Sequence, residues 1–198
     1  MDIIAAGELV RHAYANTLLN VSHRFDVGGA QAFFLTDGTL VIPGSNEISD
    51  YPEFNLNISK IKGDSGRFYH RGFLRHAQLV FTFAKGLQPK FIIGHSLGAA
   101  SAQIVGSSLG IPTIAFASPK VLSGSKKVRG EHHVVNYQRM DDPICFMPPG
   151  KKMFRHIGKT FWMAPNTLDI GFNHKVLEYI KIIKAARTNP KLPQRWPV

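Results

Sequence analysis

The chain has 198 residues, of which 44% are apolar, and this fits one globular domain with a sizeable buried core. Its 24 basic and 13 acidic residues give a formal net charge of +11, which favours anionic partners such as a phospholipid surface. The single cysteine, Cys145, excludes an intrachain disulfide, and no stretch approaches the ~18 consecutive apolar residues that a membrane-spanning helix needs.

The first half of the chain predicts a helix, a hairpin and a second helix. The N-terminus lacks the basic start and apolar core of a signal peptide, so we expect a cytoplasmic protein, with release by lysis or a dedicated secretion route as the alternative. The Asp37-Gly38 pair between two apolar runs is typical of a hairpin turn. Hydrophobic periodicity predicts these elements before residue 90: a helix over 2–20, strands over 30–35 and 40–42, a polar irregular stretch over 47–66 with a short strand at 58–61, and an amphipathic helix over 72–85.

The second half alternates short apolar runs with helical patterns. Its predicted elements are a strand at 91–93, a small-residue helix from 99 onward, strands over 111–117 and 132–137, a proline-rich loop over 141–150, one or two short strands within 154–163, and a helix over 173–186. Strands that alternate with helices predict an α/β fold with a mostly parallel central sheet and helices on both faces. We expect a single domain over 1–187, followed by a basic, proline-rich tail over 188–198 that is mobile.

The most informative stretch is Gly94-His95-Ser96-Leu97-Gly98, which spells G-x-S-x-G, the nucleophile-elbow pattern of α/β-hydrolases. A buried strand precedes it and a small-residue helix follows it, as an elbow requires. The two glycines have no Cβ, so strand and helix can pass close beneath a serine in a strained backbone conformation. We therefore expect Ser96 to be a nucleophile at the N-terminus of a helix.

A serine nucleophile needs a histidine base, and the base needs a carboxylate that orients it. In α/β-hydrolases these partners follow the serine in the order acid, then histidine. Asp141 and Asp142 both lie just beyond a predicted strand; being adjacent, they cannot both point at one histidine, and we favour Asp142. Of the later histidines, His174 opens the last predicted helix, whereas His156 lies in a predicted strand, so we favour His174 as the base.

An oxyanion hole requires two donors. One is the backbone N–H of Leu97, directly after the nucleophile. The other belongs in the loop after an early central strand, where Pro43-Gly44-Ser45 breaks the strand over 40–42. Ser45 offers its backbone N–H and its hydroxyl.

The C-terminal third is strongly basic, because beyond Asp142 the only acidic residues are Asp169 and Glu178. This charge favours peripheral contact with an anionic membrane surface. The sequence contains no zinc-ligand spacing, aromatic RNA-binding pattern or P-loop, so we expect no specific nucleic-acid partner. It implies no metal and no cofactor.

Together these residues resemble the class-three lipases, the fungal-type triacylglycerol lipase family. The motifs that carry the resemblance are, in chain order, Gly44-Ser45 for the oxyanion element, Tyr69-His70-Arg71-Gly72-Phe73 before the helix that precedes the elbow, Gly94-His95-Ser96-Leu97-Gly98-Ala99, Asn136 with the loop Asp142-Pro143 to Pro148-Pro149, His156-Ile157-Gly158, and Asn173-His174-Lys175. The resemblance implies an α/β-hydrolase fold and the triad Ser96, Asp142 and His174, and the spacing to the proline pair supports Asp142.

The chain departs from the family pattern in two places. Pro43 and Ser45 stand where the family has arginine and threonine, and Ser45 keeps both donors of that threonine. The stretch 46–69, where the family has its lid, contains few large apolar residues and also contains Pro52. We therefore expect a reduced lid.

The expected function is a serine carboxylester hydrolase that acts on a lipid ester through an acyl-enzyme. It is a lipase or an esterase, and a phospholipase A is one option. Phe146, Met147, Phe161, Trp162 and Phe172 are candidates for the acyl contact. The alternatives are an acyltransferase that uses the same triad and a non-catalytic basic binding protein on a hydrolase fold.

Overall fold

A computed structural model describes residues 1–44, 59–149, 153–165, 174–186 and 191–197. Within them the main sheet has seven strands, in the spatial order β1 (Val21–Val27), β2 (Ala30–Leu35), β3 (Thr39–Ile42), β6 (Phe91–His95), β7 (Thr113–Phe116), β9 (Val134–Arg139) and β11 (Lys159–Met163). The strands β1, β2 and β3 pair antiparallel, and every pair from β3 to β11 is parallel. The carboxyl ends of β3, β6, β7, β9 and β11 therefore meet at one edge of the sheet.

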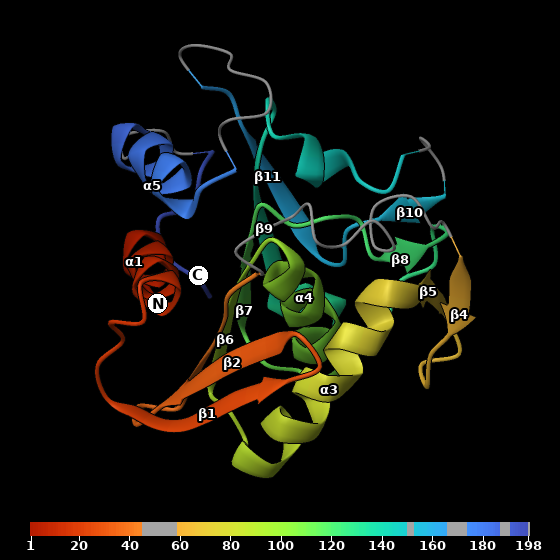
Figure 1. Ribbon diagram of the computed structural model, residues 1–198. Helices are drawn as coiled ribbons and strands as arrows, with labels where there is room; N and C mark the ends of the chain where they lie inside the picture. The colour runs from red at the N-terminus through yellow and green to blue at the C-terminus, as the bar shows by residue number, and fades with distance from the viewer. Residues whose placement is uncertain (45–58, 150–152, 166–173, 187–190, 198) are drawn as a thin grey trace.

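Helices cover both faces of this sheet, as the sequence predicts (Figure 1). On one face α1 (Ile3–Tyr14) packs against α5 (Val176–Ala185), and on the other α3 (Arg71–Leu87) packs against α4 (Leu97–Leu109). Each face has its own apolar core: one gathers α1 and α5 around Ile93, Phe116 and Tyr137, and the other gathers α3 and α4 around Leu40 and Ile92.

A small antiparallel sheet lies beside the start of α3. It contains β10 (Phe154–Arg155), β8 (Leu122–Ser123), β5 (Phe68–His70) and β4 (Lys60–Lys62). Two short 3-10 helices, η2 (Glu131–His133) and η3 (Pro143–Phe146), flank β9.

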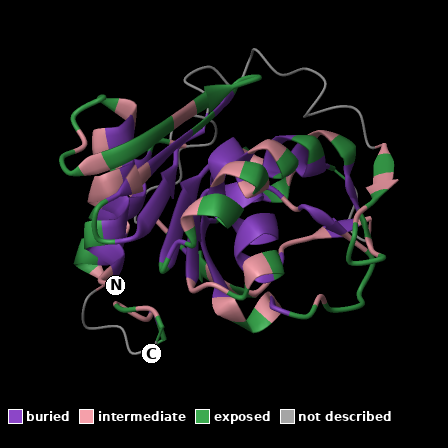
Figure 2. Ribbon diagram, turned by 90° about the horizontal axis from the view of Figure 1, so that it is seen from below, coloured by how far each residue is buried: buried purple, intermediate pink, exposed green. Residues whose placement is uncertain are grey.

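Burial follows this layering (Figure 2). The central strands β3, β6, β7 and β9 are buried along their whole length, as parallel strands covered on both faces are. The edge strand β1 exposes most of its residues. Helix α4 is buried over all but its last turn, because it lies between the sheet and α3. The small residues of α4 let this helix pack closely against the sheet and against α3. This packing holds Ser96, the residue before the helix, in place.

Most predicted elements are confirmed, but the short strands β5 and β8 were not predicted, and four further corrections apply. The first helix ends at Tyr14 rather than at residue 20, and the next strand, β1, was not predicted. The predicted strand over 132–137 begins with the 3-10 turn of η2. His156 lies between β10 and β11 rather than in a strand.

The C-terminal segment 191–197 packs on the domain, so the expectation that it is mobile is wrong for these residues. Leu192 belongs to the core between α1 and α5, and Ile3 donates its backbone N–H to Gln194 over 3.0 Å. The amino terminus of Met1 contacts the carbonyl of Trp196 at 2.9 Å. The two ends of the described chain therefore lie side by side. The boundary that the sequence places at residue 187 lies outside the described residues.

Candidate active site

Ser96 forms the apex of a strand-turn-helix elbow between β6 and α4. Its backbone has φ 57° and ψ −125°, a conformation that residues with side chains rarely adopt. The serine N–H donates to the carbonyl of Phe116 over 3.1 Å, which ties the apex to β7. A Cβ on Gly94 would lie 2.7 Å from the Cβ of Ala102 and 2.8 Å from the Cα of Ala99. Only glycine therefore permits this approach of strand and helix.

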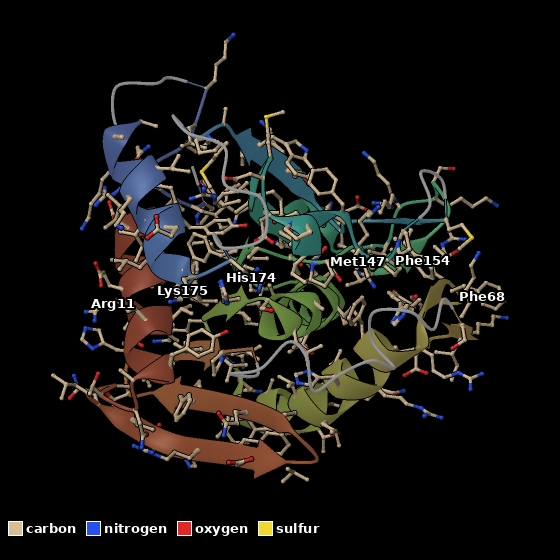
Figure 3. All side chains as sticks on the ribbon, turned by 45° about the horizontal axis from the view of Figure 1, so that its top comes forward. Arg11, Phe68, Met147, Phe154, His174 and Lys175 are labelled. Carbon is tan, nitrogen blue, oxygen red and sulfur yellow. The ribbon has the colours of Figure 1, made fainter. Side chains whose placement is uncertain are left out.

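The structure brings Ser96, His174 and Asp142 into one chain of hydrogen bonds. The Nε2 of His174 lies 2.7 Å from the Ser96 Oγ, and its Nδ1 lies 2.7 Å from the Asp142 Oδ2. With a proton on Nδ1 that is donated to the carboxylate, Nε2 is free to accept the serine proton. The three residues follow β6, β9 and β11, so the parallel sheet places them at the same edge. Figure 3 labels His174 between Lys175, on the α5 side, and Met147.

Asp142 is fully buried and held by three donors. Besides His174, the Tyr179 hydroxyl donates to Oδ2 over 2.6 Å, and the Ile144 N–H donates to Oδ1 over 3.0 Å. Burial alone would raise the pKa of the Asp142 carboxyl, but the hydrogen bond and charge of His174, with the other two donors, hold this pKa below its ordinary value. The carboxylate is therefore ionised beside His174.

The neighbouring aspartate has a different partner. Asp141 pairs with Arg139 in a buried, two-pronged ion pair, with N–O distances of 2.9 and 2.8 Å. The two aspartates therefore differ in their contacts. Asp141 neutralises a buried arginine, and Asp142 holds His174.

The other candidate histidine, His156, contacts the backbone and not Ser96. His156 contacts the carbonyl of Ser118 through Nε2 at 2.9 Å, and burial lowers its pKa to about 4. It lies apart from the hydrogen bonds of Ser96. Tyr179 was not singled out from the sequence, although it lies five residues after His174, on the apolar stripe of the last predicted helix.

Of the two predicted oxyanion donors, Leu97 lies within the described residues. Leu97 is the first residue of α4, and its N–H is one of those that a helix leaves without an intrahelical acceptor. The positive end of the helix also favours negative charge at this point. Gly44, after β3, lies against the elbow, since a Cβ there would be 2.8 Å from the Ser96 Cβ. Ser45 lies outside the described residues, as does residue range 46–58 of the expected reduced lid.

The described ranges hold no group of three or more His, Cys, Asp or Glu side chains placed to bind a metal ion. None of the helices in the same ranges combines the length and apolarity that crossing a bilayer requires.

Several solved structures with this architecture are fungal lipases. Lipase II from Rhizopus niveus aligns with a TM-score of 0.60 at 16% identity, over 84% of this chain and 79% of its own. The triacylglyceride lipase of Rhizomucor miehei aligns with a TM-score of 0.59 at 17% identity, over 89% of both chains. A further triacylglycerol lipase, whose catalytic centre is a serine protease triad, aligns with a TM-score of 0.56 at 18% identity, over 82% of this chain and 77% of its own.

No protein-family model and no curated protein matches the sequence. At these identities the likeness shows the fold, and it confirms the predicted α/β-hydrolase fold with a mostly parallel central sheet.

Proposed function

We propose that this chain, which has the fold of the fungal lipases, is a serine carboxylester hydrolase that acts through an acyl-enzyme. The observation that carries the proposal is the hydrogen-bonded chain of Ser96, His174 and Asp142 at a strained elbow. In this proposal Ser96 is the nucleophile, His174 the general base and then the general acid, and Asp142 the group that orients the imidazole.

The first half of the reaction forms the acyl-enzyme. The Ser96 Oγ attacks the ester carbonyl carbon while its proton passes to Nε2 of His174, which lies 2.7 Å away. The N–H groups of Leu97 and Ser45 stabilise the oxyanion, and loss of one such donor typically costs about 10²–10³ in rate. The tetrahedral intermediate then collapses: the bond to the alcohol oxygen breaks, and His174 gives its proton to the leaving alcohol.

The second half releases the acid. A water molecule attacks the acyl carbon and passes a proton to His174, and the Ser96 oxygen leaves and recovers that proton. Asp142 acts throughout by stabilising the positive charge on His174, because its carboxylate is buried, ionised and 2.7 Å from Nδ1.

A lipid ester is the proposed substrate because apolar side chains are exposed on the segments that carry Asp142 and His174. Four of the seven large apolar residues that are exposed in the described parts of the chain lie there: Met140, Phe146, Trp162 and Leu177. Phe146 and Trp162 stack with their ring centroids 5.0 Å apart. Such an exposed group is typical of a contact surface for acyl chains. Phe161 instead packs on Tyr137 beneath α5, and Phe172 lies outside the described residues.

Charge suggests that this contact surface meets an anionic lipid layer. Lys175 directly follows His174, and Lys120 follows β7 at the same edge, where its N–H donates to the Met147 carbonyl over 2.7 Å. Each basic side chain near such a layer contributes about 1 kcal/mol of attraction. The proposed substrate class is therefore a phospholipid or neutral lipid ester presented in an anionic interface.

Removal of the stacked aromatic pair should weaken binding to lipid vesicles. We expect the double change Phe146→Ala and Trp162→Ala to reduce partition into vesicles of mixed neutral and anionic phospholipid by about 10-fold or more, because burial of one such side chain contributes about 1.5–3 kcal/mol. Sedimentation of the protein with vesicles measures this partition.

Phe68→Ala is the matched control, because Phe68 is 50% exposed, close to the 46% of Phe146 and 44% of Trp162, but lies on β5 of the small sheet, away from His174 (Figure 3). Equal loss of binding in both variants would contradict the assignment of the surface, and so would partition that ignores salt and anionic lipid content.

Gly44→Ala should reduce ester hydrolysis by about 10²-fold, the loss that a displacement of about 1 Å causes at a reaction centre. The added Cβ would lie 2.8 Å from the Ser96 Cβ and 3.1 Å from the His95 carbonyl, so the oxyanion loop must shift. Initial rates on a soluble p-nitrophenyl ester measure the effect. Gly86→Ala is the control, since a Cβ there meets nothing within 4 Å. A Gly44→Ala enzyme as active as the Gly86→Ala enzyme would contradict the placement of this loop.

A panel of lipid esters tests the function itself. Purified protein is incubated with phosphatidylcholine, phosphatidylglycerol, a triacylglycerol and a short-chain p-nitrophenyl ester, and free acid is titrated. Hydrolysis supports the proposal and the pattern of substrates defines the class. Acyl groups recovered on an added alcohol in place of free acid would favour an acyltransferase, and no turnover of any ester would refute the proposal.

A further inference from the structure

We infer that Tyr14 and His95 are positioning residues that link the oxyanion loop to the main chain of the proposed base, His174. The inference rests on the proposed function and deepens it, because it assigns a role to residues outside the three that react. Neither was predicted from the sequence to have such a role: Tyr14 lies in a predicted helix, and His95 was named only as part of the elbow motif.

Four groups from distant parts of the chain form one line of hydrogen bonds. The backbone N–H of Gly44, two residues after β3, donates to the Tyr14 hydroxyl over 2.8 Å. The same hydroxyl lies 2.8 Å from Nδ1 of His95. On the far side of that ring, Nε2 lies 2.8 Å from the backbone carbonyl of His174. The line therefore runs from α1 and the segment after β3, through β6, to His174, two residues before α5.

The direction of each bond follows from the groups themselves. The His174 carbonyl can only accept, so Nε2 of His95 carries the proton and Nδ1 accepts from the Tyr14 hydroxyl. The hydroxyl oxygen in turn accepts from the Gly44 N–H. Burial, and then the positive charge of a protonated His174, lower the pKa of His95 to about 3, so the ring is neutral and carries one proton. Burial also raises the pKa of Tyr14, which keeps its proton.

Two consequences for the site follow from this line. First, the N–H of Gly44 is already donated to the Tyr14 hydroxyl, so this N–H is not available to an oxyanion. Second, His174 is held at two points: Asp142 holds its ring, and His95 holds its main chain. The three rings also pack together. The ring centroids of His95 and His174 lie 4.9 Å apart, and the Tyr14 ring meets the His95 ring edge-on with a centroid distance of 5.5 Å.

The first test removes the hydroxyl alone. Tyr14→Phe leaves the Gly44 N–H and the His95 Nδ1 without their partner but keeps the ring. We expect kcat for a soluble p-nitrophenyl ester to fall about 10-fold, with KM changed less than about twofold, because the loss concerns the reacting geometry rather than substrate contact.

Tyr69→Phe is the matched control. It too removes a tyrosine hydroxyl and keeps the ring, but this hydroxyl makes its hydrogen bond to Ser65 over 2.8 Å, and the tyrosine is a buried residue of β5. Both variants should melt within a few degrees of each other, and only Tyr14→Phe should lower kcat.

The second test asks for rescue by a conservative side chain. His95→Gln places an amide N–H near the position of Nε2 and can still donate to the His174 carbonyl, whereas His95→Asn reaches only the position of Nδ1. We expect the Gln variant to retain at least about 10-fold more kcat than the Asn variant at similar melting temperature, since contact with His174 is the one that positions the base. If His95 served folding alone, kcat of the two variants would follow their melting temperatures and not the length of the new side chain.

The outcomes separate this inference from the proposed function. If the wild-type protein neither hydrolyses esters nor reacts with a fluorophosphonate at Ser96, the proposed function fails. If it does both, while Tyr14→Phe matches Tyr69→Phe in kcat, or His95→Asn matches His95→Gln, then the proposed function stands and the positioning role is refuted. Loss of kcat that follows the loss of melting temperature across all four variants would refute it too.

Discussion

Replacement of Ser96 by alanine should lower kcat for ester hydrolysis by about 10⁶-fold, the loss seen when a serine nucleophile is removed from a triad whose members act as a unit. The reason is local: without Oγ, no atom can form the acyl-enzyme, and His174 loses the hydroxyl that lies 2.7 Å from its Nε2. Initial rates of acid release from a soluble p-nitrophenyl ester measure the change.

The fold of the Ser96→Ala protein should be preserved, because the side chain is small and the glycines shape the elbow. Ser108→Ala, an exposed serine near the other end of α4, provides the matched control and should keep full activity. Hydrolysis by the Ser96→Ala protein at the rate of the control would rule out Ser96 as the nucleophile.

Asp142→Asn should lower kcat by about 10⁴-fold, because an amide in place of the carboxylate favours the wrong tautomer of the histidine. An Asn N–H facing Nδ1 of His174 would move the imidazole proton to Nε2, which then points a donor at Ser96 and cannot accept its proton. Steady-state rates and the binding of substrate analogues, measured side by side, should show that chemistry is lost while binding remains.

The change should also alter how stability depends on pH. The folded-state pKa of Asp142 lies below the ordinary aspartate value of about 3.9. The unfolded chain therefore binds more protons than the folded one between the two values, and stability falls as pH drops through that window. Asp142→Asn removes this contribution. Between pH 5 and pH 3 the melting temperature of this variant should therefore fall less than that of the wild type.

Asp141→Asn is the informative comparison, because Asp141 pairs with the buried Arg139 and not with His174. Loss of one partner of a buried ion pair costs about 3–5 kcal/mol of stability. The two neighbouring changes should thus separate, with Asp141→Asn lowering the melting temperature and Asp142→Asn lowering kcat. The reverse pattern would contradict the assignment of the carboxylates.

The parts of the site that depend on local sequence could be predicted from it. Gly94 and Gly98 around Ser96, after a short apolar run, define an elbow because a close approach of strand and helix tolerates no Cβ. That Asp142 lies at this edge follows from a parallel sheet, since it comes soon after β9, whereas His174 was located by its place at the start of the last helix. Asp142 was favoured over Asp141 from the sequence and supported by the resemblance, and the physical reason is in the contacts: Asp141 pairs with the buried Arg139, and Asp142 contacts His174.

The parts that depend on contacts between distant segments could not be predicted. Tyr14 and Tyr179 lie on apolar helix stripes and look like core residues, and nothing local shows that their hydroxyls reach His95 and Asp142. The missed strand β1 is different, because its signal was present: Val21, Phe25 and Val27 alternate with polar residues before Gly28-Gly29, a typical hairpin turn. The helix pattern before it was extended too far.

The C-terminal segment shows the same limit. Its prolines and basic residues are typical of a mobile tail, yet Tyr137 donates its hydroxyl to the Pro193 carbonyl over 2.8 Å and Trp196 donates its indole N–H to the His133 carbonyl over 3.2 Å. A few long-range hydrogen bonds and one buried leucine outweigh a composition that favours disorder, and composition alone contains no information about them.

Covalent labelling of the purified protein with a fluorophosphonate, followed by peptide mapping, asks whether Ser96 is an activated nucleophile. We expect stoichiometric modification of Ser96, at a rate that falls sharply in the His174→Ala protein because the proposed base that activates the serine is gone. Modification at another residue, or no modification of a folded protein that is otherwise intact, would contradict the claim that Ser96 is an activated nucleophile.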